Sequence, residues 1–311
     1  MKRISKWIEG VTADSSVGEA AKRSLQQRLE AVEYFLPLAA EQAAEDVEYV
    51  HQLRVSTRRA MAALDLYAVL LPKKRAKRLG KALHRIRRAA GKARDLDVLI
   101  ERHAAEEGEE AQRFVERLQQ QRAAAQKPIV ATYTESRSEE KLHRRISSVL
   151  IRIREREAKP ANRTLRKWAR PRLKKATRQF VAAACSDTQD VKRLHRFRIA
   201  GKHLRYQIEL LAPAFPSALR RDIYPIVGQL QQRLGEINDH VVAQGRFARW
   251  ADRARSECQA TYMQALLQRE AGELDIRLEQ FASWWTEERE QQLQAAIRDV
   301  LQRAKQKASA E

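Results

Sequence analysis

Residues 50–71 read VHQLRVSTRRAMAALDLYAVLL, and this stretch decides the fold class. Small or apolar side chains recur along it every three or four positions, at Val50, Leu53, Thr57, Ala60, Leu64, Tyr67 and Leu71. This spacing places them on one side of an α-helix, which has about 3.6 residues per turn. The same spacing recurs further on, at Leu79, Leu83, Ile86, Ala90 and Ala93. The pattern predicts long amphipathic helices that pack one face against a core.

The composition extends this prediction to the whole chain of 311 residues. Glycine (10) and proline (8) are scarce, although the turns of an all-β fold depend on both. The prolines separate stretches of helical periodicity, which predict about eight long helices. An apolar content of 43% argues against wholesale disorder. We therefore expect an all-α fold that buries a core without disulfides or metal ions.

The chain also repeats itself at an offset of 144 residues. The coinciding pairs are Lys22 with Arg166, Arg28 with Arg172, His51 with His195, Arg54 with Arg198, Arg58 with Lys202, Pro72 with Pro216, Gly91 with Gly235, and Asp95 with Asp239. One offset held over about 75 residues predicts an internal duplication. We expect two four-helix halves, residues 10–157 and 158–308, related by a pseudo-two-fold axis. A surface common to both halves would then face itself across that axis.

The charge of the chain predicts a polyanionic partner. Lys and Arg number 61 against 40 Asp and Glu, which leaves a formal net charge of +21. So much like charge repels itself in a compact state unless an anion neutralises part of it. Nucleic acid, an anionic membrane surface and a phosphate polymer are the candidates.

Cysteine usage and hydropathy favour a cytoplasmic protein. The two cysteines, Cys185 and Cys258, lie far apart and exclude a disulfide framework. The first residues, MKRISKWIEG, contain no apolar run of signal-peptide length. No stretch approaches the roughly 18 apolar residues of a membrane span. We expect no membrane partner.

Basic side chains recur at helical spacing in three rows that contain no acid. The rows are His51, Arg54 and Arg58; His195, Arg198, Lys202 and Arg205; and Lys81, Arg85, Arg88 and Lys92. A solvated helix face normally interleaves Glu with Lys, so these rows favour an anion-binding surface. A chain of phosphates could lie along such a row, because arginine forks take phosphate oxygens in pairs.

The third row has no basic counterpart in the second half. Its equivalents are Pro225, Gln229, Gln232 and Glu236. A groove between the halves would therefore be more positive on the side of the first half. Beside the rows, Asp95 and Asp239 are expected to orient arginines, and Gly91 and Gly235 to allow close helix approach.

Four motifs resemble the signature of the CHAD family, the conserved histidine α-helical domains. They are HQLRVSTRR (residues 51–59), GKARDLDVL (residues 91–99), RLHRFRIAGKHLRY (residues 193–206) and RLGEINDHVV (residues 233–242). The resemblance covers nearly the whole chain and implies a single CHAD domain over residues 1–311. It implies two four-helix bundles about a pseudo-two-fold axis, with a basic cavity between them that binds inorganic polyphosphate.

The resemblance also implies which residues bind and which partners take part. Carried over by position, the binding residues are His51, Arg54, Arg58, Arg59, His195, Arg198, Lys202 and Arg205. Lys22, Arg28, Arg166 and Arg172 are expected additions on the first helix of each half, and Lys81, Arg85, Arg88 and Arg94 complete the predicted polyphosphate site. The implied partners are enzymes of polyphosphate metabolism, and the implied location is the cytoplasm, with association with polyphosphate granules.

We expect no catalysis, no cofactor and no metal. The sequence contains no G-x-S-x-G, H-E-x-x-H or G-x-x-x-x-G-K-[ST] motif. His51 and His195 stand among Arg and Lys, which would repel a metal cation. Glu155, Glu157 and Lys159 match the E-x-E-x-K pattern of the CYTH triphosphate hydrolases, but they follow an expected helix and not a strand.

The alternative function is nonspecific binding of nucleic acid, since any phosphate backbone would feel this charge. Single-strand binders interleave aromatic side chains with basic ones to stack bases. Aromatic residues make up only 6% of this chain. Duplex readers often show a recognition helix or a basic arm, and neither is evident. We therefore expect nucleic acid to act only as a competitor of polyphosphate.

Overall fold

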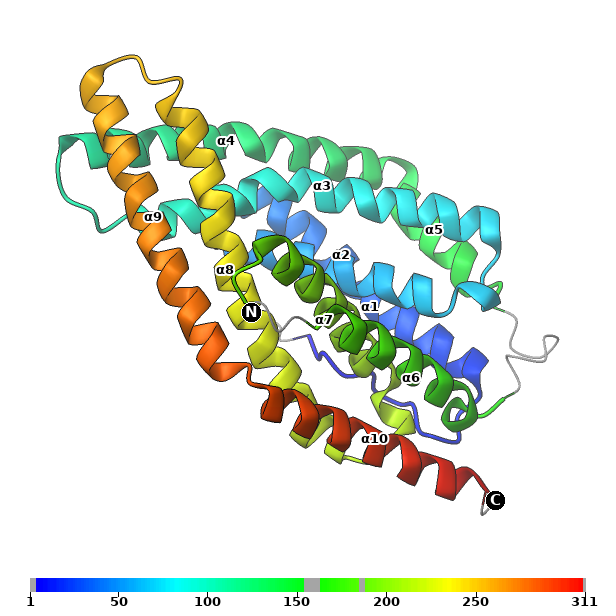
Figure 1. Ribbon diagram of the computed structural model, residues 1–311. Coiled ribbons are helices and arrows are strands. Elements are labelled where there is room, and N and C mark those ends of the chain that lie inside the picture. Colours follow the sequence, from blue (N-terminus) through cyan, green and yellow to red (C-terminus); the bar gives the residue numbers. More distant parts are fainter. Residues whose placement is uncertain (1–3, 154–162, 185–187, 310–311) are drawn as a thin grey trace. The chain divides into compact units, whose positions relative to one another are not determined.

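The computed structural model describes residues 4–153, 163–184 and 188–309, and these residues form helices and no strand (Figure 1). The chain divides into two compact units, Met1–Leu165 and Arg166–Glu311. The predicted boundary between residues 157 and 158, and the pattern Glu155, Glu157 and Lys159, lie outside the described residues. The all-α fold class is confirmed.

Unit 1 is a bundle of long helices closed by a short one. Its helices are α1 (Val17–Glu41), α2 (Glu48–Leu66), α3 (Lys73–His103), α4 (Glu109–Arg137) and α5 (Lys141–Leu150). Helix α1 packs against α2 and α4, and α3 packs against α2 and α4, so the four long helices enclose one core. The short α5 covers the side formed by α1, α3 and α4.

Unit 2 also has five α-helices among its described residues, and a five-residue π-helix, Leu219–Ile223, precedes the third of them. Its helices are α6 (Leu165–Ala183), α7 (Val191–Leu211), α8 (Tyr224–Ala251), α9 (Glu257–Trp284) and α10 (Glu287–Ser309). The 3-10 turn after α2, Ala68–Leu70, recurs after α7 as Ala212–Ala214. These turns are again 144 residues apart, as are the paired motifs in the sequence.

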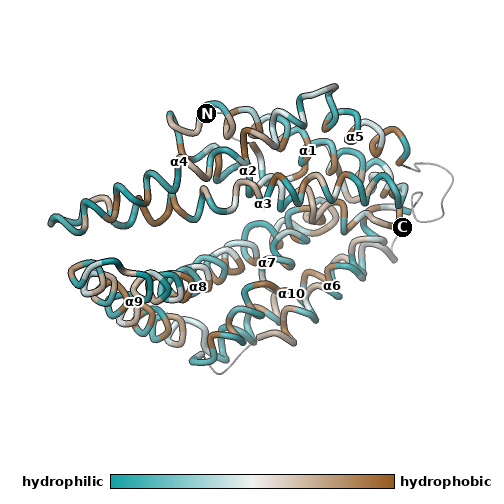
Figure 2. The backbone as a smooth tube through the Cα atoms, turned by 90° about the horizontal axis from the view of Figure 1, so that it is seen from above, coloured by the Kyte–Doolittle hydropathy of each residue, from teal (hydrophilic) through white to brown (hydrophobic). Residues whose placement is uncertain are grey.

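The amphipathic stripes that decided the fold class are the core. All seven positions of the first stripe, from Val50 to Leu71, are at most 6% exposed. All five positions of the second stripe, from Leu79 to Ala93, are at most 1% exposed. Figure 2 shows apolar residues recurring at intervals along the helices. In unit 2, Phe197 packs against Phe180 and Trp285, with ring centroids 5.1 and 5.4 Å apart.

Each unit has five α-helices among its described residues where the sequence suggested four. The extra helix of unit 1 begins after Glu140, which adopts a left-handed conformation with φ of 52°. Glycine or asparagine usually marks such a break, so a glutamate there gives no sequence signal. Helix α7 begins after Asp190, whose side chain accepts bonds from the backbone N–H groups of Lys192 and Arg193.

No helix in the described parts of the chain is both long and apolar enough to cross a lipid bilayer.

Candidate functional site

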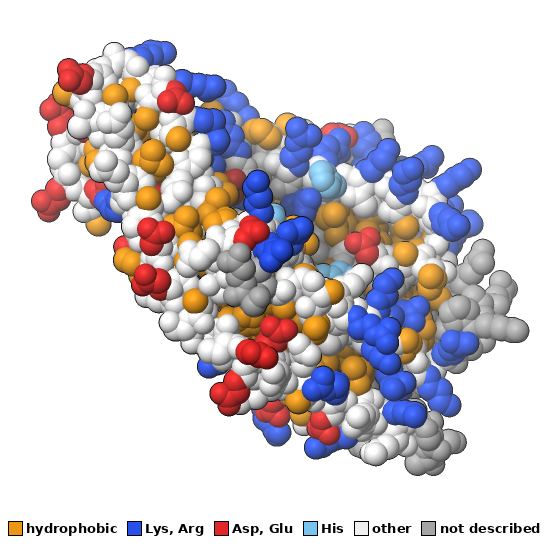
Figure 3. Space-filling model, in the orientation of Figure 1, with side chains coloured by type: hydrophobic (Ala, Val, Ile, Leu, Met, Phe, Trp, Pro, Cys, Tyr) orange, Lys and Arg blue, Asp and Glu red, His pale blue; other side chains and the backbone are white. Residues whose placement is uncertain are grey.

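Basic side chains gather over particular helices. On the face shown in Figure 3, Lys and Arg lie over α3 and α6, whereas acidic side chains lie over α9 and α10. The predicted site residues of unit 1 come from α1, α2 and α3, and those of unit 2 come from α6 and α7. Counted along the sequence, the excess of basic over acidic side chains lies mainly on α3, α6 and α7.

The first row lies along the seam between α2 and α3. His51, Arg54 and Arg58 are half-buried on α2. One guanidinium nitrogen of Arg54 donates to the carbonyl oxygen of Gly91, at 2.8 Å, and to Oδ1 of Asp95, at 2.9 Å. The expectation that Asp95 orients an arginine is therefore confirmed. These bonds fix the Arg54 guanidinium against α3 and leave its side chain 19% exposed.

Partial burial and nearby arginines disfavour the charged form of His51. Burial is the main cause that lowers the pKa of His51 below its ordinary value of 6.5. Glu48 opposes this shift, while Arg94, Arg58 and Arg54 lower the pKa further. His51 is thus held as a neutral imidazole among guanidinium groups. An anion placed here would favour the protonated form.

One side chain of the third row pairs with an acidic residue of another helix, although the row itself contains no acid. Lys81, Arg85, Arg88 and Lys92 are all exposed on α3. Arg85 donates to Oε1 of Glu135 on α4, at 2.7 Å, although 50 residues separate the two in the sequence. The remaining three basic side chains of the row present their charge to solvent.

The predicted residues of α1 have different environments. Lys22 is exposed, whereas Arg28 is only 2% exposed. The Arg28 guanidinium donates to the carbonyl oxygens of Ser5, at 3.1 Å, and of Lys6. Arg28 thus anchors the segment that precedes α1, and this environment differs from the ligand-facing one that the sequence predicted. Arg59 of α2 and Arg94 of α3 are half-buried.

The row of unit 2 has the same spacing as the first row, but its side chains have other partners. His195 is exposed, and its Nδ1 lies 2.9 Å from Oδ1 of Asn238 on α8. Arg198 and Lys202 are half-buried on α7. Arg205 lies 3.8 Å from the carboxylate of Glu209, which is 1% exposed.

The residues of α6 are tied to their own helix. Arg166 is half-buried at its start. The guanidinium of Arg172 stacks 3.5 Å from the centroid of the Trp168 ring and donates to the Trp168 carbonyl oxygen, at 3.1 Å. Stacking of this kind fixes the side chain while leaving part of its charge accessible.

The close helix approach lies at a different glycine from the two expected. A Cβ added at Gly91 or Gly235 would have no neighbour within 4 Å, so the expectation for these two is wrong. A Cβ at Gly201 would lie 2.2 Å from Nε2 of Gln231. That amide donates to the carbonyl oxygen of Arg198, at 3.2 Å. Gly201 thus lets α8 brace the row of α7.

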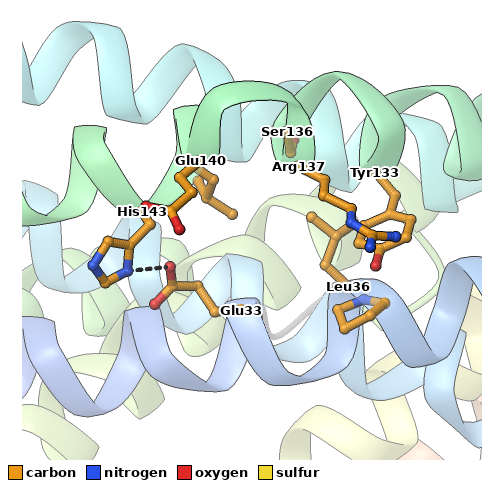
Figure 4. A pocket seen from close by; sticks show the side chains of 9 residues that line it. Glu33, Leu36, Tyr133, Ser136, Arg137, Glu140 and His143 are labelled. Atoms are coloured by element: carbon orange, nitrogen blue, oxygen red, sulfur yellow. Dashed lines mark hydrogen bonds and ion pairs between the residues drawn. The ribbon is translucent and has the colours of Figure 1, made fainter.

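Two cavities in unit 1 contain features that the sequence patterns did not single out. One, of about 930 Å³, includes Arg94, Asp97 and Arg122 in its walls. The other, of about 350 Å³, lies where α1, α4 and α5 meet (Figure 4). Its walls include Glu33, whose carboxylate lies 3.1 Å from Nδ1 of His143. Periodicity places residues on a helix face, but it gives no signal of which distant helix faces them.

Comparisons with known proteins agree with this fold. The family model described as CHAD domain matches residues 23–248. The crystal structure of the CHAD domain from the plant Ricinus communis is similar with a TM-score of 0.66 and 21% identity, covering 97% of this chain and 96% of that one. PptA from Streptomyces chartreusis is similar with a TM-score of 0.58 and 18% identity, covering 87% and 100%. No curated protein matches the sequence.

Proposed function

Because this chain belongs to the CHAD domain family, we propose that it binds inorganic polyphosphate, a ligand associated with CHAD domains, through its basic rows. The binding is non-catalytic. It serves to bring the protein to polyphosphate granules or to enzymes that act on the polymer. In unit 1 the proposed binding residues are the row of α2 and the exposed row of α3, and in unit 2 they are the row of α7.

One observation carries the proposal: the second helix of each unit presents the same half-buried row. Arg54 and Arg58 on α2 correspond to Arg198 and Lys202 on α7, and all four are half-buried. Partly dehydrated cations attract an anion more strongly than fully solvated ones do. A row with a pitch of about 5 Å suits a flexible chain of phosphates, which carries charge along its whole length.

Each type of side chain has a role in this binding. Arginine forks take pairs of phosphate oxygens, and the fork of Arg54 is already oriented by Gly91 and Asp95. The lysines contribute point charges that tolerate different positions along the polymer. His51 donates a hydrogen bond to an anionic oxygen and gains a proton as it does so. Bound counterions leave the polymer, so affinity falls as salt rises.

The decisive experiment is a competition titration of the full chain at about 150 mM salt. DNA should compete poorly if the protein neither stacks on bases nor reads a groove of the duplex. Labelled long-chain polyphosphate is displaced by unlabelled polyphosphate, duplex DNA or single-stranded DNA of matched charge. We expect polyphosphate to compete best. Equal competition by DNA would favour the nucleic-acid alternative.

Variants then assign binding to the rows. Arg54→Ala with Arg198→Ala removes one oriented fork from each unit, and each charge-assisted contact contributes about 1.5–3 kcal/mol. We therefore expect at least a hundredfold loss of affinity. Matched controls are Arg23→Ala and Arg303→Ala, one exposed, ion-paired arginine per unit, at 52% and 62% side-chain exposure. An equal loss in the control pair would show that binding is diffuse.

A further inference from the structure

The larger cavity of unit 1, of about 930 Å³, is acidic within a basic protein. It lies where the end of α1 and the start of α2 meet α3 and α4. Its charged wall residues are Glu41, Glu48, Asp97, Glu101, Arg94 and Arg122. Four acids against two arginines leave a formal charge of −2, whereas the whole chain carries +21. The field inside this cavity therefore favours a cation.

Asp97 supplies a buried acceptor that lacks a donor. Its side chain is 2% exposed, and it lines the cavity. Oδ1 accepts a bond from Nε of Arg122, whereas no group among the described residues donates to Oδ2. Burial raises the pKa of Asp97, and the bond from Arg122 opposes that rise. A buried carboxylate oxygen without a donor is costly, so a ligand that donates to it would be stabilised.

The neighbours of Asp97 hold it in place. A second nitrogen of Arg122 donates to Oε1 of Gln126, at 3.0 Å. The amide of Gln126 donates in turn to the carbonyl oxygens of Ala39 and Ala40, at 2.8 and 2.9 Å. This chain of bonds ties α3 and α4 to the end of α1. Asp97 pairs with the charge of Arg122, the bond to Gln126 orients the guanidinium, and Oδ2 of Asp97 is left to accept from a ligand.

The rest of the wall defines the ligand further. Its uncharged part is small and apolar, with four alanines, Val47 and Ile100, which suits methylene groups. None of the described residues that line it is aromatic, so a quaternary ammonium group would find no cation–π partner. Oδ2 of Asp97 instead accepts from an N–H or O–H donor, and the negative charge of the wall favours the N–H of a cation. Glu41 and Glu101 are exposed and Glu48 is half-buried, so further carboxylates lie nearer the opening.

We propose that this cavity binds a short aliphatic polyamine. One ammonium group donates to Oδ2 of Asp97, the methylene chain lies against the alanines, and a second ammonium group reaches the glutamates at the opening. This cavity takes a cation, whereas the proposed polyphosphate site takes an anion. The two sets of residues have Arg94 in common. Arg94 repels the positive charges of the ligand. Affinity therefore depends on the attraction from Asp97 and from the glutamates at the opening.

The test is calorimetric titration of the full chain with spermidine at low salt and without polyphosphate, so that the result does not depend on the proposed function. Succinate serves as a dianion of similar length. We expect saturable binding of spermidine at one site and none of succinate. Binding of succinate alone, or binding of neither compound, would overturn the proposal.

Two variants locate the site. Asp97→Asn removes the acceptor charge and should weaken spermidine binding at least tenfold, while Glu116→Gln, at an exposed position of α4 outside the cavity, should leave it unchanged. Ala123→Phe fills the cavity from its exposed wall without altering any charge, and it should also abolish binding. It keeps the test valid if Asp97→Asn lowers the thermal stability. Full binding by a folded Ala123→Phe variant would refute the cavity as the site.

Discussion

The two units share a helical framework but differ in the chemistry placed on it. Helices α2 and α7 both present a histidine followed by basic side chains at the same spacing. In unit 1, His51 lies among arginines that include Arg94, whereas in unit 2 the counterpart of Arg94 is Asn238, which lies beside His195. The exposed basic row of α3 is replaced on α8 by proline, glutamine and glutamate. Similar helices thus carry different numbers of basic side chains in the two units.

This difference predicts that unit 1 contributes most of the affinity for polyphosphate. Replacing Lys81, Arg85, Arg88 and Lys92 together by glutamine should weaken binding about a hundredfold, which corresponds to about 2.8 kcal/mol. Arg85 already pairs with Glu135, so we count phosphate contacts from the other three side chains only. Losing three contacts should reduce the slope of log affinity against log salt by about 2. Fluorescence titrations at several salt concentrations measure both quantities.

The reciprocal change on α8 sharpens the same comparison. Gln229→Arg with Gln232→Arg gives the exposed face of α8 two charges at the positions that Arg85 and Arg88 occupy on α3. Affinity should rise about tenfold if the two faces act alike. An unchanged affinity in this variant, together with a large loss in the α3 variant, would show that phosphate contacts unit 1 alone.

His51 should make the binding of polyphosphate depend on pH. Because the pKa of His51 is lowered in the free protein, His51 is neutral near pH 7 and has a proton to gain when phosphate binds. Affinity should therefore rise as pH falls from about 8 to about 6, by up to about tenfold. His51→Gln should remove most of this dependence. Calorimetry in buffers of different ionisation enthalpy measures the proton uptake directly.

The same shift affects stability with a defined sign. A histidine with a lowered pKa in the folded state binds protons better when unfolded. The stability that neutral His51 contributes is present above pH of about 6.5 and is lost as pH falls through its lowered pKa. His51→Gln should therefore flatten the decline of unfolding free energy on the acidic side. An unaltered decline would contradict the assigned cause.

Local patterns predicted the core of this fold well, because helix periodicity is a property of neighbouring residues. Every position of the stripe from Val50 to Leu71 is buried. The break between α4 and α5 was not predictable, since Glu140 takes a left-handed conformation without a glycine or proline nearby. The family motifs placed predicted binding residues on the second helix of each unit. The structure adds the hydrogen-bond partners of those basic side chains.

Contacts between distant segments limited the prediction of the site. Arg85 meets Glu135 and Asp97 meets Arg122, and no spacing along one helix reveals either pair. Arg28 was predicted to contact a ligand, but its guanidinium binds the carbonyl oxygens of Ser5 and Lys6 instead. Sequence periodicity identifies the face of a helix, whereas the segment that covers that face comes from elsewhere in the chain.

Arg28 and Arg172 give the comparison with the smallest expected effect on binding, because equivalent arginines have different structural partners. Arg28→Leu leaves the carbonyl oxygens of Ser5 and Lys6 without their donor, and should lower the free energy of unfolding by about 1–3 kcal/mol. Arg172→Leu removes one stacking contact on Trp168 and one bond to its own helix, and should cost about 0.5–1 kcal/mol. Urea unfolding measures both.

Affinity for polyphosphate should be unchanged in Arg28→Leu, since a side chain that is 2% exposed cannot reach the polymer. A tenfold loss of affinity at unaltered stability would instead show that the segment before α1 moves aside and that Arg28 contacts the ligand.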